Sequence, residues 1–88
     1  MKADKDSTLR KLKIARGQLD GIMRMIEEDR YCVDISTQLM STLSLLKNVN
    51  REILQAHIRS SVREALESDK EIPKLEEALS VLEKMAEL

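Results

Sequence analysis

Apolar residues recur at spacings of three and four along three stretches of this chain, with charged residues between them. The first stretch runs from about residue 7 to residue 28, and Ser7 is suited to cap its amino end. This spacing places the apolar side chains on one face, so the stretch predicts an amphipathic helix. Its apolar positions are Leu9, Leu12, Leu19, Ile22, Met23 and Ile26.

The second stretch predicts a helix of unusual length. The polar residues 29–33 predict a turn, and Asp34 or a neighbour is suited to cap the helix after it. Neither Gly nor Pro occurs between residues 22 and 72, and the apolar pattern resumes at Ile35. It predicts one helix of about 32 residues, about 48 Å long at 1.5 Å per residue. Its pattern follows two tracks, one of Leu39, Leu43, Leu46, Val49 or Asn50, Ile53 and His57, the other of Leu54, Ile58, Val62 and Leu66.

A third helix comes after the segment SDKEIPK at residues 68–74, which ends the second one. Pro73 suits an early helical position, because its missing N–H group is not needed there. The apolar stripe of this helix consists of Leu75, Leu79, Leu82 and Met85 or Leu88. The patterns thus predict an all-α protein whose residues 1–88 form one three-helix domain. A helix of about 48 Å exceeds the width of a monomeric globule this small, so we expect pairing with a second copy as an antiparallel helix bundle.

Composition narrows the class of protein. Hydrophobic residues make up 42% of the chain and charged residues 35%, a mixture typical of long helices that pack on one another. The single Cys excludes an internal disulfide, and no Cys and His clusters indicate a structural zinc site. No apolar run is long enough to span a bilayer, and no signal-type apolar segment comes after the charged start. We therefore expect a cytoplasmic protein without membrane association.

The only Cys, Cys32, and the only His, His57, fall on the same predicted helix. About 24 residues at 1.5 Å each separate them by roughly 36 Å along the helix axis. Within one chain they therefore cannot touch. An antiparallel second copy would bring Cys32 beside His57 of the partner subunit, and two-fold symmetry would create two identical sites.

A thiolate and an imidazole together suit soft or borderline cations such as Cu(I) and Zn(II). A helix start favours the thiolate form of Cys32, because backbone N–H groups there stabilise negative charge. Ser61 lies one turn after His57 and faces the same site, but a hydroxyl is a poor Cu(I) ligand. The sequence also allows simpler roles, Cys32 as a small buried hydrophobe and His57 as a hydrogen-bonded core residue. No Gly-rich phosphate loop and no group that orients a Cys–His nucleophile is visible, so we expect no enzyme.

Three motifs carry a resemblance to a known family: RGQ at residues 16–18, YCVDI at residues 31–35, and a His 25 residues after the Cys. With them the chain resembles the CsoR/RcnR/FrmR family of copper-sensing operon repressors over nearly its whole length. The resemblance implies an antiparallel four-helix-bundle dimer of three-helix protomers, assembled into a disc-shaped dimer of dimers. It also implies a homotetrameric transcriptional repressor that leaves its operator DNA when an inducer occupies the Cys site.

The resemblance makes Cu(I) the leading inducer. The copper branch uses a Cys together with a His and a second Cys of the partner; Cys32 and His57 match, but Ser61 takes the third place. The nickel and cobalt branch uses extra His residues, the formaldehyde branch an N-terminal Pro, and the persulfide branch two Cys, and the chain matches none of these patterns. Two alternatives stay open: a sensor of formaldehyde, reactive sulfur or another electrophile at Cys32, and a metal buffer that does not bind DNA.

The resemblance also implies residues that support sensing and DNA binding. Tyr31 and Glu77 match positions that link the bound His to the allosteric change in the copper branch. The family lacks a helix-turn-helix, so a basic helical face must meet DNA, with Gln18 adding polar contacts. The candidate cations are Lys11, Lys13 and Arg16 on the first helix, and Lys47 and Arg51 on the second. Four copies would make many phosphate contacts, so the DNA affinity should fall steeply with salt and depend on DNA shape.

Overall fold

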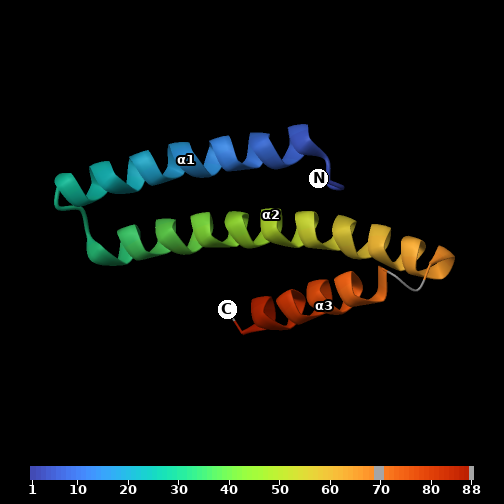
Figure 1. Ribbon diagram of the computed structural model, residues 1–88. Coiled ribbons are helices and arrows are strands. Elements are labelled where there is room, and N and C mark those ends of the chain that lie inside the picture. The colour runs from blue at the N-terminus through green and yellow to red at the C-terminus, as the bar shows by residue number, and fades with distance from the viewer. Residues whose placement is uncertain (69–70, 88) are drawn as a thin grey trace. The chain divides into compact units, whose positions relative to one another are not determined.

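The computed structural model describes residues 1–68 and 71–87, which form three α-helices and no strand (Figure 1). The helices are α1 (Lys5–Glu27), α2 (Cys32–Glu67) and α3 (Ile72–Ala86). The predicted all-α, three-helix protomer is therefore confirmed. The chain divides into two compact units, one of Lys5–Asn50 and one of Met1–Asp4 with Arg51–Leu88. Within the described residues, no helix is both long and apolar enough to cross a membrane.

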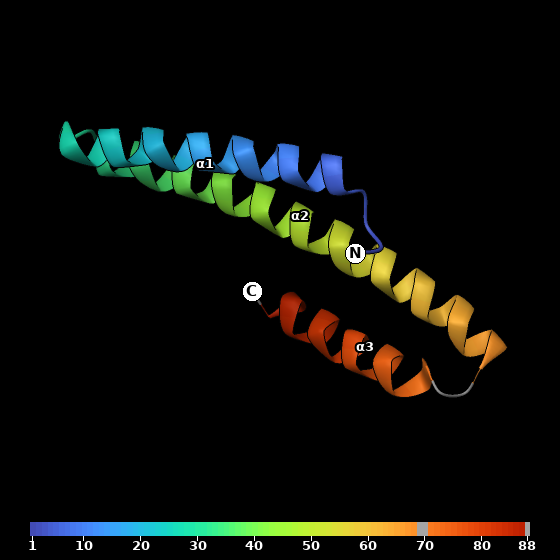
Figure 2. The ribbon, with the colours of Figure 1, turned by 45° about the horizontal axis from the view of Figure 1, so that its top comes forward.

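The Lys5–Asn50 unit is an antiparallel helix pair, α1 against the first part of α2, as both ribbon views show (Figures 1 and 2). Side-chain hydrogen bonds join the helices. Lys11 Nζ donates to Asn48 Oδ1 at 3.0 Å, and the Thr42 hydroxyl donates to Gln18 Oε1 at 2.7 Å. Both pairs fit one antiparallel register, since the position on α2 moves back along the chain as the position on α1 advances. Buried residues between these helices include Ala15, Ile22, Thr42 and Val49.

The turn between α1 and α2 is a Schellman motif, in which two hydrogen bonds cap the end of a helix. The Arg30 N–H donates to the Met25 carbonyl at 2.9 Å, and the Asp29 N–H donates to the Ile26 carbonyl at 3.1 Å. Asp29 takes the left-handed conformation that this motif requires, with φ of 53°. The predicted turn is thus confirmed, although it comes a residue or two earlier than expected.

Both predicted amino-terminal caps are wrong, because the helices start earlier than their apolar patterns. α1 begins at Lys5, so Ser7 lies inside its first turn. The Tyr31 carbonyl accepts the N–H groups of Asp34 and Ile35, at 3.0 and 3.2 Å, so α2 starts directly after Tyr31. Asp34 therefore lies in the first turn of α2, where the positive end of the helix dipole favours its carboxylate.

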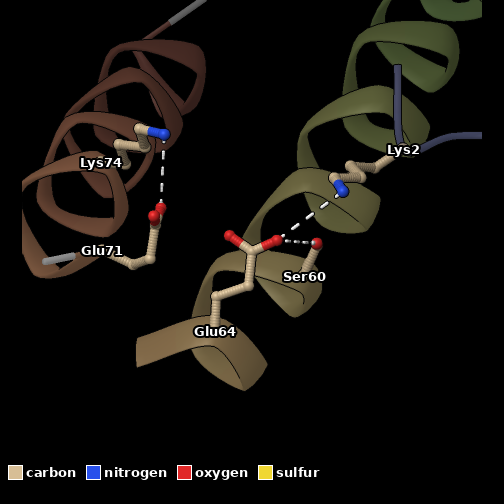
Figure 3. Close-up of polar contacts among 5 residues, drawn as sticks. All are labelled: Lys2, Ser60, Glu64, Glu71 and Lys74. Carbon is tan, nitrogen blue, oxygen red and sulfur yellow. Dashed lines mark hydrogen bonds and ion pairs between the residues drawn. The ribbon is translucent and has the colours of Figure 1, made fainter. Parts of the chain in front are cut away.

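The second unit consists of the N-terminal segment Met1–Asp4, the later part of α2, and α3. Leu54, Ser61 and Ala78 are buried in it. Pro73 stands at the first or second position of α3, as predicted. Lys74 Nζ lies 3.4 Å from Glu71 Oε2 at the start of this helix (Figure 3). The predicted stripe residue Leu88 lies outside the described residues.

The helix pair leaves much of its apolar surface exposed. On α1 the exposed apolar residues are Leu9, Leu12, Ile14, Leu19, Met23 and Ile26. On the first part of α2 they are Val33, Leu39, Met40, Leu43 and Leu46. A hollow of about 290 Å³ opens among them, lined by Leu19, Leu39, Met40, Leu43 and Leu46 with Ser36 and Thr42. A single chain therefore does not cover the apolar face that the sequence pattern assigns to a core.

Candidate functional site

Cys32 is the first residue of α2 and carries an exposed, free thiol. Within one chain it is therefore not the small buried hydrophobe of the alternative reading. Its position at the start of α2 agrees with the prediction. Tyr31 directly precedes it and is 68% exposed.

His57 and Ser61 stand one turn apart on α2 but differ in exposure. The imidazole of His57 is exposed, so the alternative of a core histidine is not supported within one chain. Ser61 is only 3% exposed. A ligand from outside the chain can therefore reach the imidazole of His57 more easily than the hydroxyl of Ser61.

One chain cannot bring its own Cys32 and His57 together, because α2 runs unbroken from Cys32 to Glu67. Twenty-five residues of continuous helix separate these side chains by roughly 37 Å. Within the described residues, no group of three or more His, Cys, Asp and Glu side chains is arranged to hold a metal ion. A site that uses both residues therefore requires a second chain.

Glu77, the other residue expected to support the site, lies on α3 with its side chain exposed. Tyr31 lies beside Cys32 in the other unit and is also exposed. Their expected roles near a bound His stay predictions.

The predicted DNA-contacting residues differ in how far their side chains are exposed to solvent. Lys13, Arg16 and Arg51 are exposed. Lys11 is half-buried and bonded to Asn48, and Lys47 is half-buried. Gln18 is also half-buried, and its Oε1 accepts the hydrogen bond from Thr42, so it joins the two helices of its unit.

A second basic cluster, which was not predicted from the sequence, lies in the unit of Met1–Asp4 and Arg51–Leu88. It is formed by Lys2, Arg59 and Arg63 around Ser60. Arg59 and Arg63 are spaced i, i+4, a signal that the sequence does contain. Lys2 is 57 positions before Arg59, so no local pattern links it to the pair.

A sequence profile described as "Metal-sensitive transcriptional repressor" matches residues 4–84, nearly the whole chain. The chain belongs to this family. The resemblance stated from the RGQ and YCVDI motifs is therefore confirmed. The family is one of repressors, which agrees with the expectation that the chain is not an enzyme.

Two relatives show how this family member compares with characterised proteins. It is 37% identical over 81 residues to the copper-sensing transcriptional repressor CsoR of Bacillus subtilis (strain 168), covering 92% of this chain and 80% of that one. It is 48% identical over 56 residues to CsoR of Mycobacterium ulcerans (strain Agy99), covering 64% of this chain and 48% of that one. The match thus spans about half the length of the mycobacterial relative.

Two solved structures share the fold of this metal-sensitive repressor. The copper-sensing repressor CsoR with Cu(I) from Geobacillus thermodenitrificans NG80-2 superposes with a TM-score of 0.82 at 28% identity, over 92% of this chain and 84% of that one. The nickel-responsive transcriptional regulator InrS gives a TM-score of 0.81 at 24% identity, over 91% and 93% of the two chains. The likeness to InrS supports the three-helix fold alone.

Proposed function

We propose that this chain is an operator-binding repressor that is released when Cu(I) joins Cys32 of one subunit to His57 of the partner subunit. The observation that carries the proposal is the placement of the only thiol and the only imidazole. Both are exposed, and both stand on one unbroken helix that keeps them far apart within a chain. The chain belongs to the metal-sensitive repressor family, and its Bacillus subtilis relative is named a copper-sensing repressor. We therefore assign Cu(I) sensing to this pair.

The exposed apolar face supports an assembly of identical chains. Residues such as Leu39, Met40 and Leu43 are 46%, 65% and 52% exposed on α2. A second helix pair docked on this face would bury them in a four-helix bundle, and two such dimers would form the homotetramer. In this proposal residues 1–88 act as a single domain that both senses the inducer and binds DNA.

The donor set fits Cu(I) in low coordination. A thiolate and a neutral imidazole are ligands that Cu(I) accepts, and both side chains are open to a partner. Ser61 is not a third ligand in this proposal, because its hydroxyl is a hard donor that Cu(I) binds poorly. Bound Cu(I) would supply a coordinate link between two subunits. We further propose that Glu77 and Tyr31, which directly precedes Cys32, orient the partner's His57 through hydrogen bonds.

DNA binding is proposed for the basic residues of α1 and α2. The exposed Lys13, Arg16 and Arg51 supply the principal phosphate contacts, and the half-buried Lys11 and Lys47 supply further charge at the helix surfaces. Gln18 orients α1 against α2 through its hydrogen bond with Thr42, and it adds a polar group to the proposed DNA-binding surface. Release is a consequence of linkage: if Cu(I) binds the DNA-free form more tightly, DNA must bind the copper form less tightly by the same factor.

A second candidate function is a sensor of electrophiles at Cys32. It is favoured by the exposed thiol at a helix start and by the lack of a second sulfur at Ser61. In that case formaldehyde or a reactive sulfur species, instead of Cu(I), would release the DNA.

A gel-shift experiment separates these functions. Purified protein and the DNA upstream of its own gene are combined with no addition, with Cu(I), or with formaldehyde. Salt-sensitive binding that Cu(I) abolishes, and that Cu(I) does not abolish in the Cys32→Ala variant, supports the proposal. Release by formaldehyde alone selects the electrophile sensor, and the absence of DNA binding indicates a metal buffer.

A further inference from the structure

The second unit contains a basic hollow that the proposed copper site and DNA-contacting residues do not use. We propose that this hollow, lined by Lys2, Arg59, Ser60, Arg63 and Ala56, binds a phosphate group. Its volume is about 390 Å³, a size typical of small-ligand sites. All of its lining comes from the N-terminal segment and α2 within one unit.

Arg59 and Arg63 are the main anion-binding groups of the hollow. Arg59 and Arg63 are one turn apart on α2, so both guanidinium groups extend over the same face. Both are exposed, and among the described residues neither forms an ion pair. Like charges at this spacing repel and weaken the helix, so an anion between them offsets that repulsion. Guanidinium groups match the oxygens of phosphate with two parallel hydrogen bonds each.

Lys2 and Ser60 complete the site from its edge. Lys2 Nζ lies 3.7 Å from Glu64 Oε1, and the Ser60 hydroxyl donates to the same oxygen at 3.4 Å (Figure 3). Glu64 therefore holds the N-terminal segment against α2 and keeps an ammonium and a hydroxyl beside the arginines. The lining of the hollow contains three cations and no carboxylate, which favours a phosphate group over a neutral ligand.

The size of the hollow indicates that the phosphate is part of a larger molecule. A phosphodiester of the DNA backbone and a small phosphorylated ligand share the chemistry that these side chains recognise. Binding of a DNA phosphodiester rests on the proposed repressor function, whereas binding of a phosphate group as such does not.

Titration of inorganic phosphate at constant ionic strength tests the site. The parent protein is compared with the Arg59→Gln/Arg63→Gln double variant and with an Arg24→Gln/Arg30→Gln control, which removes the same charge from exposed arginines elsewhere. Isothermal calorimetry should show binding to the parent and the control, and at least about tenfold weaker binding to the Arg59/Arg63 variant. No binding to the parent, or an equal loss in both double variants, would overturn the proposal.

The salt dependence of DNA binding then identifies the source of the phosphate. Each backbone contact that the Arg59/Arg63 variant loses should lower the slope of log affinity against log salt by about 0.9. A lower slope than that of the control supports the site with DNA as its ligand. An unchanged slope, with phosphate binding lost in the titration, supports the site with a small phosphorylated ligand. If the parent binds no DNA, the repressor proposal fails while the phosphate titration still decides this one.

Discussion

Ser61 is the residue on which the choice of inducer depends. Cys32 and His57 match the copper branch of the family and are exposed, whereas Ser61 is buried and carries a hydroxyl at the third expected ligand position. A thiol there would add a soft donor one turn from His57. In our proposal Cys32 and the partner's His57 therefore set the affinity for Cu(I). One substitution at Ser61 can add a third donor.

We predict that Ser61→Cys tightens Cu(I) binding by at least about tenfold, equivalent to about 1.4 kcal/mol. Competition against a chromophoric Cu(I) chelator measures this change. Ser41→Cys is the matched control, because it adds a thiol at an exposed position on the side of α2 opposite to His57. Equal tightening in both variants would mean that an extra thiol anywhere is enough.

Thr42 is the buried polar residue that joins α1 to α2, through its bond to Gln18. We predict that Thr42→Val lowers the free energy of unfolding by about 1–2 kcal/mol, because Gln18 Oε1 loses its donor in a half-buried place. Urea unfolding at fixed protein concentration measures the effect. Thr37→Val, which removes an exposed bond to the Val33 carbonyl, should change stability much less. A comparable loss in the control would contradict the role given to Thr42.

At the scale of the elements, the apolar spacing predicts the number, order and type of the helices correctly, because amphipathic faces repeat over many residues. It fails at the helix starts, since Ser7 and Asp34 are equally suited to a cap and to a first turn, and backbone hydrogen bonds decide between them. The turn shows the same limit. Nothing in the residue type of Asp29 requires a left-handed backbone, which the Schellman bonds impose.

We predict that Asp29→Gly stabilises the protein by about 0.5–1 kcal/mol, because glycine adopts a positive φ without strain from a Cβ atom. Asp20→Gly, at an exposed position inside α1, should instead destabilise by about 0.3 kcal/mol, because Gly is a still poorer helix former than Asp. Urea unfolding of the two variants checks both signs. A loss of stability in Asp29→Gly would show that the Asp29 side chain contributes more than its conformation costs.

At the scale of the whole molecule, the sequence predicts that a site of Cys32 and His57 needs a second chain, but it does not predict how the two chains pack. Helix length alone separates Cys32 from His57, and the structure confirms this with an even longer α2. The basic hollow could not be inferred, because it depends on Lys2 folding back beside Arg59 and Arg63. The exposed apolar face of α1 and α2 then supplies the surface on which a second copy would pack.

We predict that Leu43→Glu shifts the protein toward monomer at concentrations where the parent is an oligomer. Leu43 is 52% exposed, so a charge there disturbs the proposed interface more than the fold of the single chain. Sedimentation velocity measures the change. Ser41→Glu, at an exposed position on the opposite side of α2 from Leu43, should leave the oligomer intact. An unchanged oligomer in Leu43→Glu would place the interface elsewhere.

The most direct test of the central claim is a subunit-mixing measurement with Cys32→Ala and His57→Ala. Each variant alone lacks one ligand at every site, so neither should bind Cu(I) tightly. After the two are unfolded and refolded together, half of the dimers are mixed, and each mixed dimer regains one complete site. Our account predicts recovery of about a quarter of the parental Cu(I) sites. Tight binding by either variant alone, or no recovery in the mixture, would contradict a site shared between subunits.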